Sequence, residues 1–364
     1  MRNGVVIVAA LLLLATPWSS RADVNAAGGQ IRDLQEQLNS LKEMIDVQPS
    51  EKFVDCLATN DDDALLQDVL DSTIPGDIIL VRGPCEDVTL SVTTDHLTIK
   101  GMDDSPAKLI GTGEPINTFG AGERAVLRVR HAADLKLENL LLTGGAHGLR
   151  IEQSANVLGR QLETSSNLDS GVLVAYDAGF ACTDCKFNNN VRRGITALDL
   201  VWVCGNFEAS GNYIGVGVYN GGVLASSGAS CENDGNSALE AFLENNSEGI
   251  QVSQSGTVSM DAGGSLTMKN NGRAIGVYRN SVVGVNGMDL NFDSNGYWPV
   301  GVAEMSSAHL NPYQPTYATS IDRIYTRDGA HLHIDGSNDP LPEIFCDKNT
   351  SAIVRGSRVC SSED

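Results

Sequence analysis

Basic and aromatic residues are both scarce in this chain. Its 364 residues include 25 Lys and Arg against 46 Asp and Glu, so the formal net charge is −21. An acidic surface repels phosphate groups, which argues against a general nucleic-acid-binding protein and against adhesion to anionic lipid. Aromatic residues make up 5% and apolar residues 41% of the chain, enough for one large, elongated domain.

The apolar stretch near the amino end is too short to cross a membrane. Residues 1–22 carry Arg2, an apolar core at 5–14, and small residues at positions −3 and −1 of a cut before Asp23. This pattern is typical of a secretory signal peptide. No Cys follows it that could be lipidated. We therefore expect a secreted protein, extracellular or periplasmic, without membrane insertion.

A pattern of about two dozen residues recurs between residues 126 and 304. The clear copies begin at Gly148, Gly171, Gly194, Gly215 and Gly249, and looser copies begin at Val126, Ala274 and Pro299. In each copy the first and third residues after the start are apolar, as in Leu149/Ile151 and Val172/Val174. This alternation predicts a short strand with one buried face, and Ile151, Val174, Ala197, Val218 and Val252 should form one interior stack.

Two further positions recur near the end of each copy. Asn tolerates left-handed backbone and bonds along a stack, so we expect a corner ladder at Asn167, Asn190, Asn212, Asn245, Asn270 and Asn295. A second buried strand position is expected at Leu141, Phe187, Phe242 and Phe292. Helical repeats are excluded because the copies are rich in Gly and Asn and lack sustained 3–4 spacing. A propeller blade would need about 40 residues.

Eight cysteines in a secreted chain predict up to four disulfides. Cys56 and Cys85 lie near the amino end of the domain, Cys346 and Cys360 near the carboxyl end, and the other four in three consecutive coils. Adjacent coils lie about 4.8 Å apart, so a bond across two spacings exceeds disulfide reach. The remaining pairing is Cys182–Cys185 with Cys204–Cys231. A reduced redox pair at Cys182 and Cys185 is the alternative, without a thioredoxin-like context to support it.

Residues 30–45 predict a short heptad helix with Ile31, Leu34, Leu38, Leu41 and Ile45 at its a and d positions. Two heptads are marginal alone, so this coiled-coil-like helix either packs on the domain or contributes to a homo-oligomer through residues 31–45. The next segment, residues 61–81, predicts an amphipathic helix begun by Asp, then a Pro-Gly-Asp turn and a strand. This helix would cover the open end of the coil stack.

The sequence ALLQDVLDSTIPGDIILVRGPCEDVTLSVTTDHLTIKG resembles the opening of right-handed parallel β-helix proteins of the pectin-lyase-like superfamily. The resemblance covers about residues 55–305. It implies an all-β, single-stranded right-handed parallel β-helix (solenoid) with an N-terminal capping helix, and is compatible with a Cys56–Cys85 disulfide. We expect a signal peptide (1–22), a linker and heptad helix (23–54), a cap and first coils (55–125), the repeats (126–304) and a C-terminal cap (305–364). The superfamily contains both enzymes and non-catalytic proteins, so fold alone does not give function.

The outward positions of the repeats bring basic residues together on two neighbouring coils, at Arg128, Arg130, His131 and Arg150. Guanidinium groups bind carboxylates in a bidentate manner, so this group suits an acidic sugar; the alternative is that it neutralises Glu152. Tyr297 and Trp298 are candidates for stacking on sugar rings, with cap packing as the alternative. No cofactor is expected.

The outward face offers only scattered carboxylates, at Glu152 and Asp199. The catalytic motifs of polygalacturonase-like enzymes and of alginate epimerases are missing. We therefore expect a non-catalytic protein that binds polysaccharide or acts as a surface or structural module. The alternative is a polysaccharide lyase acting on an acidic glycan, which would use calcium in the manner of the superfamily.

Overall fold

The computed structural model describes residues 49–364 apart from a set of short segments. These segments are 59–61, 103–104, 113–123, 228–237, 262, 297–298, 312–322, 335–342, 348–349, 355–356 and 361–364. The predicted signal peptide and heptad helix lie outside the described residues. So do Tyr297, Trp298 and Cys231.

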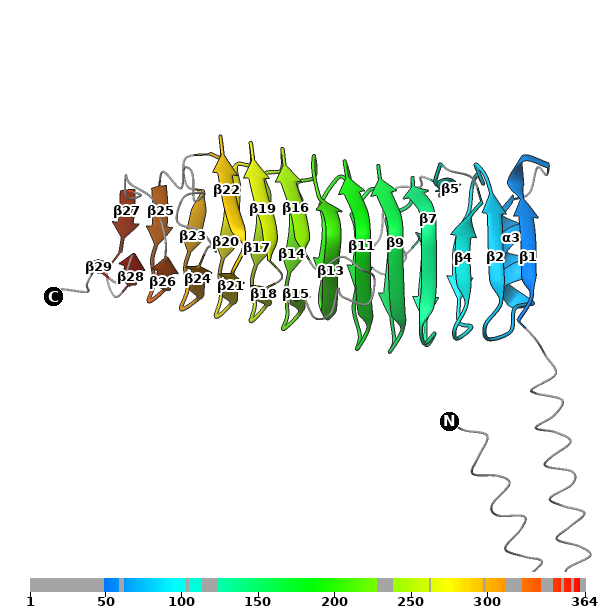
Figure 1. Ribbon diagram of the computed structural model, residues 1–364, viewed down its shortest axis with the longest axis horizontal. Helices are drawn as coiled ribbons and strands as arrows, with labels where there is room; N and C mark the ends of the chain where they lie inside the picture. The colour runs from blue at the N-terminus through cyan, green and yellow to red at the C-terminus, as the bar shows by residue number, and fades with distance from the viewer. Residues whose placement is uncertain are drawn as a thin grey trace, which may run out of the picture. The chain divides into compact units, whose positions relative to one another are not determined.

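The described residues form a parallel β-helix, in which strands from successive coils lie side by side (Figure 1). One of its sheets has eleven strands, and every pairing in it is parallel. These strands are β3 (Leu90–Val92), β6 (Ala125–Arg130), β8 (His147–Glu152), β10 (Ser170–Val174), β12 (Arg193–Ala197), β14 (Ile214–Val218), β17 (Glu248–Val252), β20 (Arg273–Val277), β23 (Val300–Val302), β25 (Arg323–Thr326) and β27 (Glu343–Cys346).

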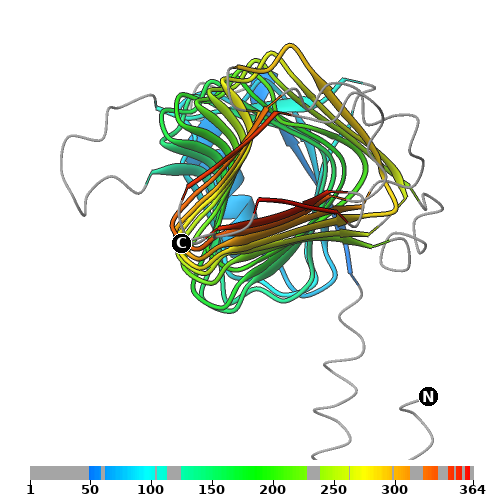
Figure 2. The same ribbon diagram turned by 90° about the vertical axis from the view of Figure 1, so that its left-hand side faces the viewer.

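The other sheet has 18 strands arranged in two rows. They are β1 (Glu51–Asp55), β2 (Ile78–Arg82), β4 (Thr98–Gly101), β5 (Ala107–Ile110), β7 (Leu135–Thr143), β9 (Asn156–Ser165), β11 (Gly179–Asn188), β13 (Leu200–Glu208), β15 (Val223–Ser227), β16 (Leu239–Glu244), β18 (Thr257–Asp261), β19 (Gly264–Lys269), β21 (Val282–Asn286), β22 (Asp289–Asp293), β24 (Ser307–Asn311), β26 (His331–Ile334), β28 (Ser351–Val354) and β29 (Ser357–Cys360). Two rows arise because a long strand pairs with two shorter strands along its length. Strand β7 pairs with β4 and β5 in this way, and β13 pairs with β15 and β16. Viewed along the axis, each coil is therefore three-sided (Figure 2).

The predicted interior stack is confirmed. Ile151, Val174, Ala197, Val218 and Val252 are direct register partners on β8, β10, β12, β14 and β17, and each is fully buried. A slip of one residue in any coil would expose its apolar row, so the alternation of the sequence fixes the register. Apolar side chains of this kind fill the space between the ribbons in Figure 2.

An asparagine ladder runs along one corner, with two members shifted from the prediction. Amide groups bond in series at Asn167, Asn190, Asn212, Asn246, Asn271 and Asn295. The predicted ladder members Asn245 and Asn270 are wrong, and Asn246 and Asn271 take their places. Asn245 and Asn270 are exposed and have φ of 56° and 52°, so they supply the left-handed turn, and the following Asn points inward.

The second buried position is also misassigned in two coils. Phe187 and Phe292 are fully buried as predicted, but Phe242 is 39% exposed and Leu141 is half-buried. Their neighbours Leu142 and Leu243 point inward instead. The strands turn at different points in different coils. A position counted back from the start of the next copy therefore falls on the outward-facing neighbour in these two coils.

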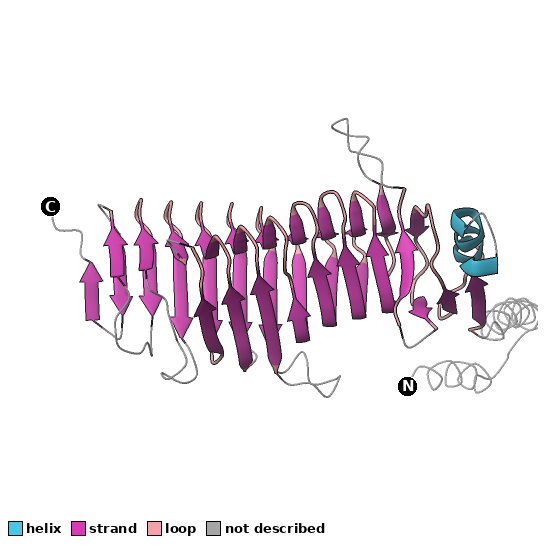
Figure 3. Ribbon diagram, turned by 90° about the horizontal axis from the view of Figure 1, so that it is seen from above, coloured by secondary structure: helices cyan, strands magenta, loops and turns pink. Residues whose placement is uncertain are grey.

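The predicted capping helix is present as α3 (Asp62–Asp71), which lies at the amino end of the coil stack (Figure 3). Its residues Leu66 and Leu70 are buried in the core. The short 3₁₀ helix η1 (Cys56–Ala58) precedes it. This cap places an apolar helix face over the first coil, where the interior would otherwise meet water.

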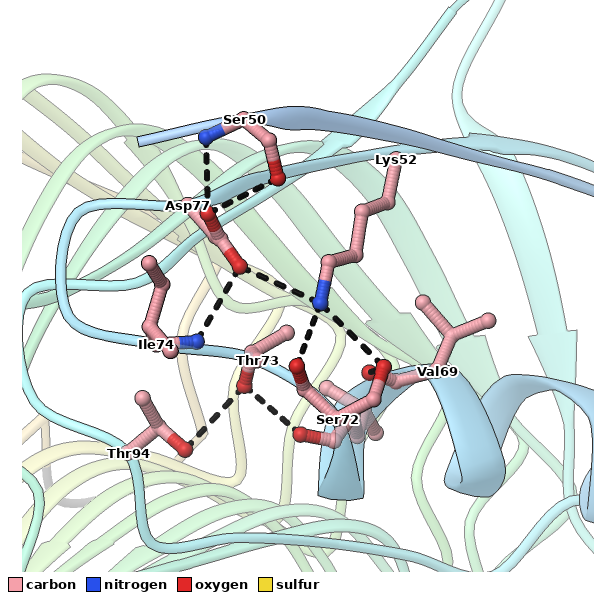
Figure 4. Close-up of polar contacts among 9 residues, drawn as sticks. Ser50, Lys52, Val69, Ser72, Thr73, Ile74, Asp77 and Thr94 are labelled. Atoms are coloured by element: carbon pink, nitrogen blue, oxygen red, sulfur yellow. Dashed lines mark hydrogen bonds and ion pairs between the residues drawn. The ribbon is translucent and has the colours of Figure 1, made fainter. Parts of the chain in front are cut away.

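Asp77 joins the first strand to the turn that follows α3 (Figure 4). Its carboxylate accepts hydrogen bonds from the backbone N–H of Ser50 at 2.7 Å and of Ile74 at 3.0 Å, and lies 3.2 Å from Lys52 Nζ. Burial opposes its ionisation, but the hydrogen bonds from Ser50, Ile74 and Lys52 outweigh burial and lower its pKa to about 2. The last residue of the Pro-Gly-Asp turn thus connects β1 to the turn that follows α3.

Three disulfides match the predicted pairs. Cys56–Cys85 lies in the amino-terminal cap, Cys182–Cys185 lies within β11, and Cys346–Cys360 joins β27 to β29. Cys204 on β13 is also disulfide-bonded. Its predicted partner, Cys231, lies outside the described residues.

Parallel pairing continues past Glu304, where the sequence pattern ends. Strand β25 pairs with β23, β27 with β25, and β26 and β28 extend the larger sheet, before β29 pairs with β28 in an antiparallel manner. The region expected to be a cap therefore adds further coils, and only its last strand reverses direction.

Candidate functional site

Glu152 is the centre of the arginine group that the sequence predicts. Three guanidinium groups surround its carboxylate: Arg128 Nε donates to Oε1 at 2.6 Å, Arg150 Nε donates to Oε2 at 2.7 Å, and Arg130 Nε also donates to Oε1. Arg128 and Arg130 lie on β6, in register with Arg150 and Glu152 on β8. Pairing of these two strands thus brings together residues that are 24 positions apart.

Counted over its four residues, Arg128, Arg130, Arg150 and Glu152, the arginine cluster has a formal charge of +2. Glu152 and Arg150 have side chains only 2% and 7% exposed, while those of Arg128 and Arg130 are 22% and 34% exposed. A carboxylate offers about four acceptor positions, fewer than the N–H donors of three guanidinium groups. The arginines therefore neutralise Glu152, and the group keeps a positive outer surface that suits an anion.

The other predicted site residues lie apart from this cluster or outside the described chain. His131 follows β6 in a left-handed turn with φ of 53° and is exposed, outside the ion-paired group. Tyr297 and Trp298 lie outside the described residues. Among the later aromatic residues, Tyr325 lies on β25 in register with Gly301.

The cluster begins a row of outward positions along the eleven-stranded sheet. The residues of this row, each in register with the next, are Arg128, Arg150, Leu173, Thr196, Gly217, Gln251, Gly276, Gly301 and Tyr325. The seven strands from β6 to β20 give six spacings, or about 29 Å. In the middle of the row Thr196 is followed by Gly217, and Thr196 Oγ1 lies 2.8 Å from Ser170 Oγ on β10.

A second polar group on this face is not singled out by the sequence analysis. We call it the Tyr–Arg array, and its members are Arg193, Tyr219, Glu248, Gln251, Arg273 and Tyr278. It contains two equivalent units. The guanidinium carbon of Arg193 lies 5.1 Å from the ring centre of Tyr219, and that of Arg273 lies 5.6 Å from that of Tyr278.

Each tyrosine of the array lies over a glycine two positions earlier. A Cβ atom at Gly217 would come within 2.5–2.8 Å of the Tyr219 ring, and one at Gly276 within 2.7–3.0 Å of the Tyr278 ring. The side chains therefore lie back along the sheet rather than projecting from it. The repeated sequence Gly-Val-Tyr, at 217–219 and again at 276–278, is the signal that could have identified the array.

Hydrogen bonds join the two units into one network. Tyr219 Oη donates to Gln251 Oε1 at 2.5 Å, and Gln251 Nε2 donates to Glu248 Oε2 at 2.6 Å. Arg273 Nη1 donates to Glu248 Oε1 at 2.7 Å, and Tyr278 Oη lies 3.3 Å from the same oxygen. All five side chains are half-buried, so each is fixed in place yet partly open to solvent.

The charges of the array balance, unlike those of the arginine cluster. Arg273 pairs with Glu248 at 2.7 Å, and Arg193 lies 3.6 Å from Asp169 Oδ1. Burial raises the pKa of Tyr219, although the nearby Arg193 acts in the opposite direction. Its phenol therefore remains protonated at neutral pH and can donate a hydrogen bond.

The remaining titratable groups of the described residues are scattered. Asp199 lies between β12 and β13, and burial raises the pKa of its carboxyl group. No group of three or more His, Cys, Asp or Glu with metal-binding geometry occurs among the described residues. His333 stacks on His309 of the neighbouring strand, with ring centres 4.7 Å apart. Within the described part of the chain, no helix is long and apolar enough to cross a membrane.

Comparison with known proteins gives one structural likeness. No family model and no curated protein matches the sequence. Among solved structures, the chain is similar to an alginate lyase from Paenibacillus sp. str. FPU-7, with 14% identity and a TM-score of 0.41. The match covers 83% of this chain and 99% of that one.

Proposed function

We propose that the protein is a secreted, non-catalytic β-helix protein that binds an acidic polysaccharide through the arginine cluster. The observation that supports this most is the set of three arginines around one buried carboxylate, four residues with a formal charge of +2. In a chain with a formal net charge of −21, such a surplus is local and fixed in position. A carboxylate on a sugar ring is the anion that the planar guanidinium groups fit best.

The shape of the surface also supports a chain-like ligand. The outward row continues from the cluster along parallel strands in unbroken register, so its residues are spaced regularly along the direction in which an extended polymer would lie. The disulfides are compatible with export to an oxidising compartment. That the protein is exported to such a compartment is part of the proposal.

The test is binding of polygalacturonate and polymannuronate at low and high salt, with a neutral glucan as the ligand control. Binding of the uronate polymers should weaken as salt rises, because ionic contacts near the surface are screened over about 8–10 Å at physiological ionic strength. Arg130→Ala should lower the affinity about 10–100-fold, the loss of one charge-assisted hydrogen bond. Arg150→Ala should also lower it, because the cluster loses one positive charge. If the unchanged protein binds no uronate polymer more tightly than the glucan, the proposal is wrong.

Arg279→Ala is the matched control for these variants. Arg279 also belongs to the eleven-stranded face, but it is 61% exposed and pairs with Glu304 at 3.4 Å. Its removal should change the affinity less than twofold. Thermal unfolding of all three variants separates loss of binding from loss of structure, which matters most for the buried Arg150.

A polysaccharide lyase is the second candidate, favoured by the protonated phenol of Tyr219 next to Arg193 on the same face. A lyase needs a base that removes the proton beside the sugar carboxylate, a proton donor for the leaving sugar and a cation beside that carboxylate; Tyr219 and Arg193 would be the donor and the cation. The two functions are distinguished by incubating the protein with the same uronate polymers and following the ultraviolet absorbance of unsaturated products. Turnover that disappears in Tyr219→Phe while binding persists would establish the lyase and exclude the non-catalytic function.

A further inference from the structure

We propose that the Tyr–Arg array is a second, charge-neutral subsite, which binds sugar rings of the same polysaccharide at a distance from the arginine cluster. This inference rests on the proposed function and goes beyond it, because it assigns ring and hydroxyl recognition to residues outside the cluster. The two groups lie on one face of one sheet. Strands β8 and β14 are three spacings apart, or about 14 Å.

The chemistry of the array fits a sugar ring rather than a second carboxylate. The paired charges of Arg273 with Glu248 and of Arg193 with Asp169 leave no net charge to attract an anion. Phenol and amide groups bond to the hydroxyls of a pyranose, and the solvent-exposed parts of the half-buried tyrosine rings offer apolar contact to its C–H groups. Tyr219, Gln251 and Tyr278 supply these groups.

The array is held in position before any ligand arrives. Gly217 and Gly276 leave room for the tyrosine rings to lie on the sheet, and the arginines pack against those rings. Arg273 Nε is buried and has no hydrogen-bond partner among the described residues. Side chains that are already ordered lose little conformational entropy on binding, which favours affinity.

Strands β14 and β20 are two spacings apart, so the two tyrosines are about 10 Å apart along the axis. A ligand that reaches from the arginine cluster to Tyr278 must therefore span about 24 Å, the five spacings from β8 to β20. A disaccharide is too short for this span, and a long oligosaccharide can contact both groups. The inference thus predicts that the affinity depends on ligand length.

The experiment measures binding of digalacturonate and of a long oligogalacturonate by calorimetry. Tyr219→Ala should lower the affinity for the long oligogalacturonate about 3–10-fold, the usual contribution of an aromatic contact. The affinity for digalacturonate should change less than twofold. The salt dependence should be unchanged in this variant, because the array is neutral. In Arg130→Ala both ligands should weaken and the salt dependence should fall.

Gly217→Ala tests position without removing any functional group. The new Cβ would meet the far end of the Tyr219 side chain at 2.5 Å, so the ring must shift while the backbone stays in place. The long ligand should weaken as in Tyr219→Ala. Gly284→Ala is the matched control, since its nearest neighbours are 3.9 Å away on the other sheet. Tyr176→Ala, which removes an exposed tyrosine in the turn after β10, controls for loss of a surface ring.

The outcomes separate this inference from the proposed function. If Arg130→Ala weakens the long ligand but Tyr219→Ala and Gly217→Ala do not, the array is structural and the inference is wrong, while the function stands. If the unchanged protein binds neither ligand, the function fails and the inference fails with it. If the folding of Tyr219→Ala is impaired, Gly217→Ala decides the result, because it retains every side chain of the array.

Discussion

Arg150 and Glu152, two residues apart on β8, form an ion pair whose two side chains are both buried, with Arg150 Nε 2.7 Å from Glu152 Oε2. Residues i and i+2 of a strand share one face, so the pair is formed within the strand itself. The neighbouring strand then adds Arg128 and Arg130 to the same carboxylate. Glu152 is therefore the residue on which the order of the whole cluster depends.

Replacing that carboxylate should be costly. In Glu152→Gln three guanidinium groups lose the negative charge that they share, and removal of one charge of a buried ion pair typically costs about 3–5 kcal/mol. We expect a loss of this size in the free energy of unfolding, measured with urea at neutral pH. Glu304→Gln is the control, since Glu304 is 41% exposed and its pair with Arg279 should be worth under about 1 kcal/mol. Equal losses in the two variants would contradict the central role of Glu152.

Asp77 should make the stability of the cap depend on pH. Its pKa is about 2 in the folded protein against an ordinary value of 3.8, so its contribution is present above pH 3.8 and is lost as the pH falls through 2. Asp77→Asn should lower the free energy of unfolding by about 1–3 kcal/mol at neutral pH and flatten its decline in acid. Urea unfolding at pH 7 and near pH 2 measures both effects. Asp293→Asn, at a 51% exposed carboxylate, should show neither.

The asparagine ladder gives a test of neighbouring residues with opposite roles. Asn246 is buried, bonds to Asn271 Oδ1 at 3.0 Å and accepts the backbone N–H of Asn212 at 2.9 Å. Asn246→Ala leaves buried donors without partners and should cost about 2–4 kcal/mol. Asn245→Gly keeps the left-handed turn and should cost less than about 0.5 kcal/mol. If Asn245→Gly cost more than Asn246→Ala, then Asn245 would be the ladder residue, as expected from the sequence.

The last disulfide can be checked by peptide mapping without reduction. Cys204 is disulfide-bonded, and Cys231 is the cysteine left over once the other three pairs are formed. We expect a peptide that joins Cys204 to Cys231. Alkylation of a free thiol at either position in the unreduced protein would show that this pairing is wrong.

The sequence predicts the fold well because one rule repeats in every coil. The apolar residues at the first and third positions, Val172 and Val174 for example, can satisfy both burial and strand pairing in only one register. Rules that depend on where a strand turns are weaker. Asn139 and Gln161 have φ of 52° inside β7 and β9, and such kinks decide which of two adjacent side chains points inward.

The candidate site could be predicted only in part. The arginine cluster has a local signal, since Arg128 and Arg150 occupy the same position of adjacent copies. The array has a weaker one, because Arg193 and Tyr219 are 26 residues apart and Tyr219 and Gln251 are 32 apart, across the longest coil. Sequence distance did not reveal that these residues are neighbours, although the repeated Gly-Val-Tyr did mark their place. Neutralisation of Glu152 was the alternative that the sequence offered, and the side-chain geometry shows that all three arginines bond to this one carboxylate.

The asparagine ladder has a consequence for how the domain comes apart. It links the coils from Asn167 to Asn295, whereas the disulfides Cys56–Cys85 and Cys346–Cys360 lie in the coils beyond its two ends. In a stacked array each coil is stabilised mainly by its neighbours, so loss of order starts at the terminal coils and moves inward. A reducing environment would therefore leave a resistant central segment with frayed ends. The length of the ordered coil stack, and not merely its stability, would then vary with the redox state of its surroundings.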